Sequence, residues 1–246
     1  PLLQGDFEIS FTASSGRPNP YGAQTTMDRG VGNILSIPRS QILVNLRNIQ
    51  QGNGIAAADA LKVICPRCGR SFQDDGRQAV VCPDHPEAPT IMNFTVEMET
   101  GTGKTYVYLR TIYELHQKYS FRKFVIVVPS IAIREGVLKN LEITREHFQS
   151  DFNHPPLHYQ VYSSAKLSGL RNFAVSNAIQ ILVINIDSFA KDQNVINQIR
   201  ETGVRPIEYI QAVHPVVIMD EPQNMETDRR REAIANLNPC CTLRYS

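Results

Sequence analysis

The sequence predicts an α/β protein with a doubly wound, mainly parallel sheet. Its second half alternates short runs rich in valine and isoleucine with stretches of helical periodicity. Nearly continuous apolar strands separated by helices are typical of a parallel sheet covered on both faces, with functional loops at the carboxyl ends of the strands. The expected strands are 123–129, 157–162, 179–186, 215–222 and 241–246. The expected helices include 131–148 and 168–178.

Length and composition bound the organisation of the chain. With 246 residues, of which 42% are hydrophobic and 20% charged, it can bury a large core as one main domain with a small appendage. A formal net charge of +1 argues against a uniformly basic nucleic-acid binder but leaves room for a local basic strip. No apolar run approaches the roughly 20 residues of a membrane span. We therefore expect a cytoplasmic protein with no membrane partner, and the initial Pro1 suggests residues missing upstream.

The first 60 residues are expected to form a loop-rich part of the main domain with one helix. Residues 11–33 are rich in glycine, proline, serine and threonine, which predicts extended or looped chain. Residues 39–51 carry apolar side chains at helical spacing, and Gly52-Asn53-Gly54 follows as a stop signal. A single helix is therefore expected in this segment.

Residues 61–90 are expected to form a small zinc-ribbon-like insertion. A Cys-x-x-Cys pair is followed by a Cys-x-x-His pair, and each pair has proline directly after its first cysteine. The four expected Zn²⁺ ligands are Cys65, Cys68, Cys82 and His85. They supply the donors that tetrahedral zinc prefers and leave no open position, which indicates a structural site. Asp74-Asp75-Gly76 is expected to turn a hairpin between the pairs. The alternative is unpaired thiols in a polar loop.

The stretch METGTGKT, Met98 to Thr105, satisfies the phosphate-loop pattern G-x-x-x-x-G-K-[ST] everywhere except at its first position. A strand is expected at 94–98 and a helix from Tyr106, so backbone N–H groups and the positive helix end would converge on an anion. The residues expected to bind the nucleotide are Thr100, Gly101, Thr102, Gly103, Lys104 and Thr105. The two glycines let the backbone curl around phosphates.

Two side chains of this loop have expected chemical roles. Lys104 would reach the β- and γ-phosphates of ATP, and the Thr105 hydroxyl would bind Mg²⁺. The alternative is a glycine turn before an ordinary helix.

The apolar run 215–222 contains two adjacent carboxylates at its end, Asp220 and Glu221. In an α/β sheet they would lie where a nucleotide held by the phosphate loop presents Mg²⁺ and its γ-phosphate. We expect Asp220 to hold Mg²⁺ through its water shell and Glu221 to orient and deprotonate the attacking water. The alternative is a solvated turn after a strand.

Five segments together resemble the first motor domain of the Res subunit of type III restriction enzymes and related superfamily 2 helicases. They are METGTGKT, VIVVPSIAIREGVLKNLEI, VINIDSF, MDEPQNM and LNPCCTLRYS. The resemblance implies a RecA-like ATP-binding domain over residues 91–246 in which Met98 is a family variant. It also implies that Pro129 and Ser130 contact the nucleic-acid backbone and that Gln223 links the nucleotide state to a partner domain. Many relatives have arginine where this chain has Ile131.

The resemblance implies an ATP-dependent translocase or helicase that uses ATP and Mg²⁺ and acts on double-stranded DNA. In such motors a second RecA-like domain supplies an arginine finger. The chain stops at Ser246, which matches the first residue of the family's Ser-Ala-Thr motif. We therefore expect a truncated restriction endonuclease subunit, nearly inactive without its second motor domain and its nuclease domain. A modification methyltransferase subunit is a candidate partner.

Two other functions stay open on the sequence. One is a repair or RNA helicase with the same fold, and the other is a zinc-stabilised nucleotide- or DNA-binding module without turnover. Three further groups are weaker candidates. Arg229-Arg230-Arg231 is interpreted as a solvated helix face rather than a phosphate contact, and His154 and His158 as loop residues rather than ligands. Cys240 and Cys241 are interpreted as small buried hydrophobes.

Overall fold

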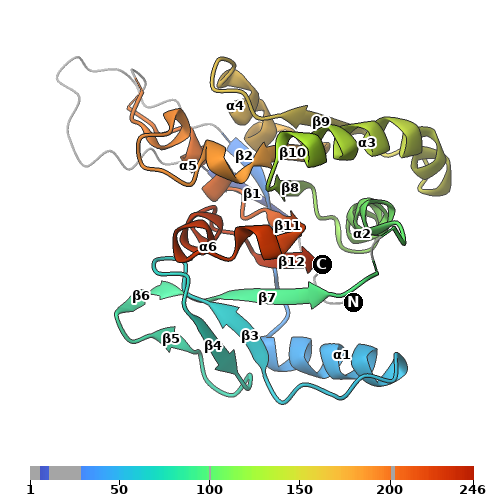
Figure 1. The fold of residues 1–246 in the computed structure, drawn as a ribbon, viewed down its shortest axis with the longest axis vertical. Helices are drawn as coiled ribbons and strands as arrows, with labels where there is room; N and C mark the ends of the chain where they lie inside the picture. Colours follow the sequence, from blue (N-terminus) through green and yellow to red (C-terminus); the bar gives the residue numbers. More distant parts are fainter. Residues whose placement is uncertain (1–5, 11–28, 100, 201–202) are drawn as a thin grey trace.

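The computed structural model describes residues 6–10, 29–99, 101–200 and 203–246. Eight strands form one sheet in the order β4-β3-β7-β12-β11-β8-β10-β9 (Figure 1). Their bounds are β3 Leu61–Ile64, β4 Ser71–Asp74, β7 Ile91–Val96, β8 Lys123–Val128, β9 Leu157–Val161, β10 Ile179–Asn185, β11 Val216–Asp220 and β12 Cys241–Tyr245. The six strands from β7 to β9 in this order are parallel, and β3 and β4 are antiparallel.

Helices cover both faces of the sheet. Their bounds are α1 Arg39–Gly52, α2 Lys104–Tyr119, α3 Ile131–Asp151, α4 Ser168–Val175, α5 Ile207–Gln211 and α6 Asp228–Ala235. Three short 3-10 helices follow β10 and β11: η1 Ile186–Ser188, η2 Val195–Asn197 and η3 Pro222–Met225. Within these residues no helix is both long and apolar enough to cross a membrane.

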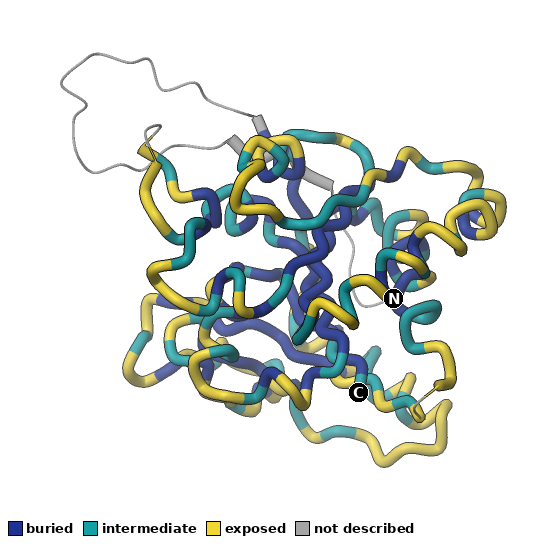
Figure 2. The backbone as a smooth tube through the Cα atoms, turned by 45° about the horizontal axis from the view of Figure 1, so that its top comes forward, coloured by how far each residue is buried: buried dark blue, intermediate teal, exposed yellow. Residues whose placement is uncertain are grey.

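The strands divide their side chains between two buried cores. Phe124 and Ile126 of β8 pack in a cluster with α1, α2 and α3, whereas Val125 and Val127 pack in a second cluster with α4, α5 and α6. This alternation follows from the two-residue period of a strand. Figure 2 shows the buried backbone running through the middle of the molecule with exposed segments around it. The doubly wound, mainly parallel α/β fold is thereby confirmed.

Several predicted boundaries differ from those observed. The strand expected at 94–98 is β7, which begins at Ile91, and the helix expected at 168–178 ends at Val175 as α4. In the first segment, β1 (Asp6–Ser10) pairs antiparallel with β2 (Arg29–Asn33), and residues 11–28 lie outside the described ranges. The side chain of Asn33 ties β2 to β8, since Asn33 Nδ2 donates to the Lys123 carbonyl at 2.7 Å.

The segment 61–90 is joined to the main sheet. Its strand β3 pairs with β7 and with β4, so it extends the sheet past the phosphate-loop strand. A second hairpin, β5 (Val81–Cys82) with β6 (His85–Pro89), forms a separate two-stranded sheet.

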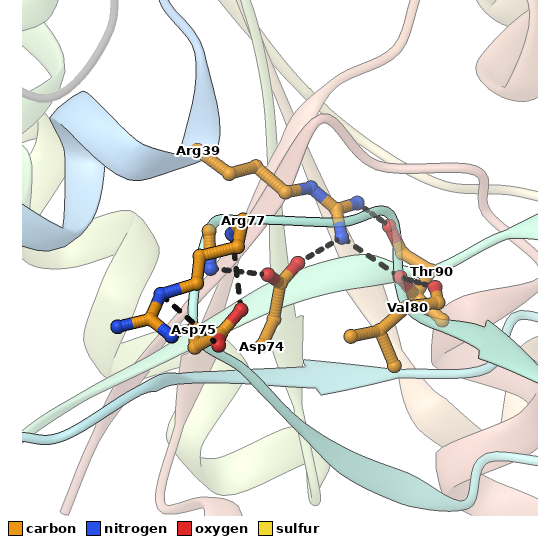
Figure 3. A network of polar contacts seen from close by, with 7 residues as sticks. Arg39, Asp74, Asp75, Arg77, Val80 and Thr90 are labelled. Atoms are coloured by element: carbon orange, nitrogen blue, oxygen red, sulfur yellow. Dashed lines mark hydrogen bonds and ion pairs between the residues drawn. The ribbon is translucent and has the colours of Figure 1, made fainter.

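The hairpin expected around Asp74-Asp75-Gly76 is wrong. The turn itself forms, because the Gly76 amide donates to Asp74 Oδ1 at 2.8 Å, but β4 pairs with β3 and β5 with β6. The buried Asp74 carboxylate is held instead by Arg39 of α1, with Nη1 2.7 Å from Oδ2 (Figure 3). The same guanidinium donates to the Thr90 hydroxyl at 2.9 Å, which links α1 to the middle and to the C-terminal end of segment 61–90.

Candidate nucleotide-binding site

The phosphate loop joins β7 to α2. Gly101 and Gly103 have φ values of 83° and 90°, a left-handed backbone that glycine adopts without steric cost. The Thr102 hydroxyl donates to the Glu99 carbonyl at 2.6 Å, which closes the loop on itself. Lys104 is the first residue of α2, where the N–H groups of the first turn lack partners within the helix and favour an anion. Thr100 lies outside the described residues.

The sheet places the acidic pair at the same edge as this loop. Strand β12 lies between β7 and β11, and its Tyr245 is in register with Val96 on one side and Asp220 on the other. Neighbouring strands are about 4.8 Å apart, so the ends of β7 and β11 are separated by roughly 10 Å. The loop after β7 and the acidic pair at the end of β11 therefore lie close together at the same edge of the sheet.

Glu221 leaves the sheet in an unusual conformation. Its φ of 55° and ψ of 57° are left-handed, which costs a residue with a Cβ about 1–2 kcal/mol. The turn η3 follows at once and carries Gln223, whose Nε2 donates to Glu221 Oε2. Backbone strain of this kind concentrates at functional sites, and here it directs the carboxylate towards α2.

Lys104 and Glu221 form an ion pair across the site. Lys104 Nζ lies 2.8 Å from Glu221 Oε1, and the side chains are 11% and 26% exposed. The hydrogen bond from Lys104, followed by that from Gln223, lowers the pKa of Glu221. Glu221 is therefore a carboxylate at neutral pH and can accept a proton.

Asp220 has a different environment. It is 5% exposed, and burial raises the pKa of its carboxyl group. The Tyr108 hydroxyl of α2 donates to Asp220 Oδ2 at 3.0 Å. Asp220 and Thr105 offer the hard oxygen donors that Mg²⁺ prefers. The residues at this position thus fit a Mg²⁺–nucleotide complex.

Tyr108 is the site residue that sequence reasoning missed. It is fully buried and lies four residues after Lys104 on α2. Its helical spacing from Lys104 places it on the same face, which is the one signal the sequence carries for it. Burial raises the pKa of Tyr108, so its phenol stays protonated and remains a donor.

A groove opens beside this site at the ends of β8 and β10. Its volume is about 700 Å³, and its lining includes Pro129, Ser130, Arg134, Asn185 and Asp187. Ser130 begins α3 as its N-cap, with Oγ accepting from the Ile133 amide at 3.3 Å. The two residues expected to contact nucleic acid, Pro129 and Ser130, thus lie together at the groove.

The four expected zinc ligands come together in the insertion. Their ligand atoms all lie within 4.8 Å of one another, and within the described ranges no other group of metal-binding side chains was found. The distances are 3.7 Å from Cys68 Sγ to Cys82 Sγ, 3.7 Å from Cys65 Sγ to His85 Nδ1 and 3.6 Å from Cys82 Sγ to His85 Nδ1.

These distances fit a tetrahedral zinc ion. Zinc bonded to sulfur at about 2.3 Å separates its ligand atoms by about 3.8 Å. The backbone also turns towards sulfur, since the Arg67 amide donates to Cys65 Sγ at 3.4 Å. Gly69, with φ 68°, lets this knuckle pack against α6, because an added Cβ there would meet Arg231 at 3.1 Å.

The three arginines of α6 lie at least partly exposed at the surface, as expected, and each also forms contacts within the chain. Arg230 donates from Nη1 to the Asn224 carbonyl at 2.7 Å and from Nη2 to Asp187 Oδ1 at 2.9 Å. Arg229 donates to the Ala190 carbonyl at 2.9 Å, and Arg231 pairs with Asp228. These contacts of Arg229 and Arg230 hold α6 against the loop that follows β10.

The other weak candidates are as expected. His154 and His158 are exposed and lie outside the cysteine and histidine cluster. Cys241 is buried in the core at the start of β12, and Cys240 packs partly against the same core.

A glycine-rich loop before a helix, an acidic pair on the same sheet edge and a parallel strand order define a RecA-like phosphate-loop domain. The chain belongs to the family of type III restriction enzyme Res subunits, whose model matches residues 69–246.

Individual relatives agree with this family. The chain is 35% identical over 175 residues to the StyLTI Res subunit of Salmonella typhimurium, covering 62% of this chain and 18% of that protein. It is 28% identical over 233 residues to the EcoP15I Res subunit of Escherichia coli, covering 86% of this chain and 21% of that protein. The chain therefore spans about a fifth of the length of these relatives.

A distant likeness to a solved structure was also found. The UvsW helicase of bacteriophage T4 is 15% identical, with a TM-score of 0.41 over 97% of this chain and 82% of that chain.

Proposed function

We propose that this chain is the ATP-binding motor domain of an ATP-dependent DNA translocase or helicase, in the restriction subunit of a type III restriction endonuclease. The observation that carries the proposal is the Lys104–Glu221 contact of 2.8 Å, because it joins the phosphate-binding cation and the water-activating base at one sheet edge. The relatives that match are Res subunits, so the chemistry of the site and the family agree.

In the proposed reaction, Lys104 binds the β- and γ-phosphates and the loop amides hold the phosphate oxygens. Mg²⁺, when bound near Thr105 and Asp220, would neutralise charge on the phosphates. Glu221 accepts a proton from water as the water oxygen bonds to the γ-phosphorus, and the bond from that phosphorus to the bridging oxygen of ADP breaks. Gln223 keeps the Glu221 carboxylate in place through its hydrogen bond.

For DNA, we propose that the groove at the ends of β8 and β10 contacts the phosphate backbone. Ser130 begins α3 beside it, so the positive end of that helix favours phosphate. Ile131 is 63% exposed and cannot bind phosphate through a charge. Arg134, one turn later, is the cation among the described lining residues. Its guanidinium pairs with Glu135 at 2.8 Å, and it would supply the charge for phosphate on leaving that exposed carboxylate.

For the insertion, we propose one structural Zn²⁺ held by the four clustered ligands. A second RecA-like domain and a nuclease domain of the same polypeptide, and a modification subunit, are the partners that the complete activity requires. The second domain would supply an arginine finger to the transferring phosphoryl group.

ATP hydrolysis by the full-length protein, measured with and without DNA, tests this function. We expect double-stranded DNA to stimulate hydrolysis. Stimulation by RNA in place of DNA would favour an RNA helicase. Tight nucleotide binding with no hydrolysis under any condition would favour a binding module without turnover.

A further inference from the structure

Tyr108 is buried next to the candidate Mg²⁺ site and does not contact solvent. Its side chain is fully buried, and its ring packs edge-on against Tyr245 with centroids 5.5 Å apart and an interplanar angle of 62°. The ring is therefore held in place by packing. The hydroxyl is the one polar atom that this side chain brings into the site.

The Tyr108 hydroxyl contacts one of the two residues that would face Mg²⁺. It donates to Asp220 Oδ2 at 3.0 Å, across 112 positions of the sequence. A phenol has one proton, so this contact uses the whole donor capacity of Tyr108. Asp220 is 5% exposed, so its carboxylate has little space in which to turn away from this donor.

This contact orients the Asp220 carboxylate. Because Oδ2 is occupied by Tyr108, Oδ1 is the oxygen left to accept from water in the Mg²⁺ shell. One buried hydroxyl thus selects which oxygen of Asp220 faces the ion. Groups that orient metal-binding residues in this way are typically needed for full metal affinity.

We propose that Tyr108 is a positioning residue for Mg²⁺, whose hydroxyl fixes the Asp220 carboxylate in the orientation that receives the ion. This inference rests on the proposed nucleotide site. Tyr108 itself contacts neither nucleotide nor ion. Its effect is therefore on the Mg²⁺ dependence of nucleotide binding and not on the metal-free affinity of the phosphate loop.

The test removes one oxygen atom. Tyr108→Phe keeps the ring and its packing on Tyr245, and Tyr113→Phe is the matched control. Tyr113 lies on the same helix and is 3% exposed, but its ring packs against Phe148 and Phe152, away from the site. Binding of a fluorescent ATP analogue to the 246-residue chain is measured over a range of Mg²⁺ concentrations and in EDTA.

We expect the Mg²⁺ concentration at half-maximal binding to rise about tenfold in Tyr108→Phe. The affinity in EDTA should stay within about twofold of the parent chain, which also shows that the loop remains folded, and Tyr113→Phe should change neither value. An unchanged Mg²⁺ midpoint in Tyr108→Phe overturns the inference. An equal loss of nucleotide affinity with and without Mg²⁺ also overturns it, because the hydroxyl would then stabilise the fold of the site and not the position of the ion. If the parent binds no nucleotide, the proposed function itself fails.

Discussion

Lys104 Nζ lies 2.8 Å from Glu221 Oε1, so the cation expected to meet the phosphates is paired with the carboxylate expected to activate water. The hydrogen bond from Lys104 lowers the pKa of Glu221 and holds its carboxylate in place. Under the proposed function, binding of ATP exchanges this ion pair for contacts between Lys104 and phosphate. That exchange would free Glu221 to accept a proton only when a γ-phosphate is present.

Replacing Lys104 tests the nucleotide site directly. Lys104→Ala should weaken ATP binding on the order of 100-fold, because charge-assisted contacts in a partly dry site are strong. Titration with a fluorescent ATP analogue measures the effect. The control is Lys118→Ala on the same helix, whose exposed ammonium pairs with Glu114 at 2.6 Å and should leave affinity unchanged. Equal ATP affinity in Lys104→Ala and the parent would refute the assignment.

Glu221→Gln separates binding from hydrolysis. In the full-length protein we expect ATP hydrolysis to fall by about 10²- to 10⁴-fold, the range for loss of a general base. ATP binding should be as tight as before or tighter, since Lys104 no longer has an anionic partner to leave. Steady-state hydrolysis and equilibrium binding are measured on the same preparation. Hydrolysis at the parent rate would show that another group deprotonates the water.

The insertion should contain one Zn²⁺ per chain. Cys82→Ser should lower the zinc content measured by elemental analysis, whereas Cys240→Ser, outside the cluster, should not. Because metal binding at such sites is coupled to local folding, chelation should increase hydrogen exchange in residues 61–90 more than in the parallel sheet. Protein prepared without chelator that contains no zinc contradicts the site.

Lys123 should make stability depend on pH. It is 0% exposed, its Nζ donates to the Phe173 and Ser176 carbonyls at 2.6 and 2.5 Å, and burial lowers its pKa to about 7. The unfolded chain, with its lysine pKa near 10.5, binds more protons than the folded chain between these two values. The free energy of unfolding therefore rises with pH in this window.

Urea unfolding at pH 7 and pH 9 measures this effect. We expect Lys123 to contribute a rise on the order of 2 kcal/mol, and Lys123→Met should remove that part of the rise. Equal pH dependence in the two proteins would show that Lys123 is charged in the folded state throughout.

The sequence predicted those features that are encoded locally. Strands β8, β10 and β11 each contain a run of at least four apolar residues, and they form as expected. The phosphate loop and the acidic pair were found from their residue spacing. The pairing of β3 with β7 and the contact of Tyr108 with Asp220 were not predicted, since both join segments far apart in the chain. The turn at Asp74 was predicted correctly, but the pairing of the strands beside it was not. Asp74 is held by Arg39 of α1, which lies 35 residues earlier in the chain, and such a distant contact cannot be found from the local sequence.

The position of the insertion has a consequence for self-association. Without β3, the edge of β7 at Ile91 and Met92 would be open, and an apolar edge strand can pair with other molecules. Strand β3 covers this edge, and the sheet ends instead at β4, a strand of four residues. Short edge strands are poor templates for intermolecular pairing. Segment 61–90 therefore covers the strand that leads into the phosphate loop at the edge where that strand could otherwise pair with another molecule.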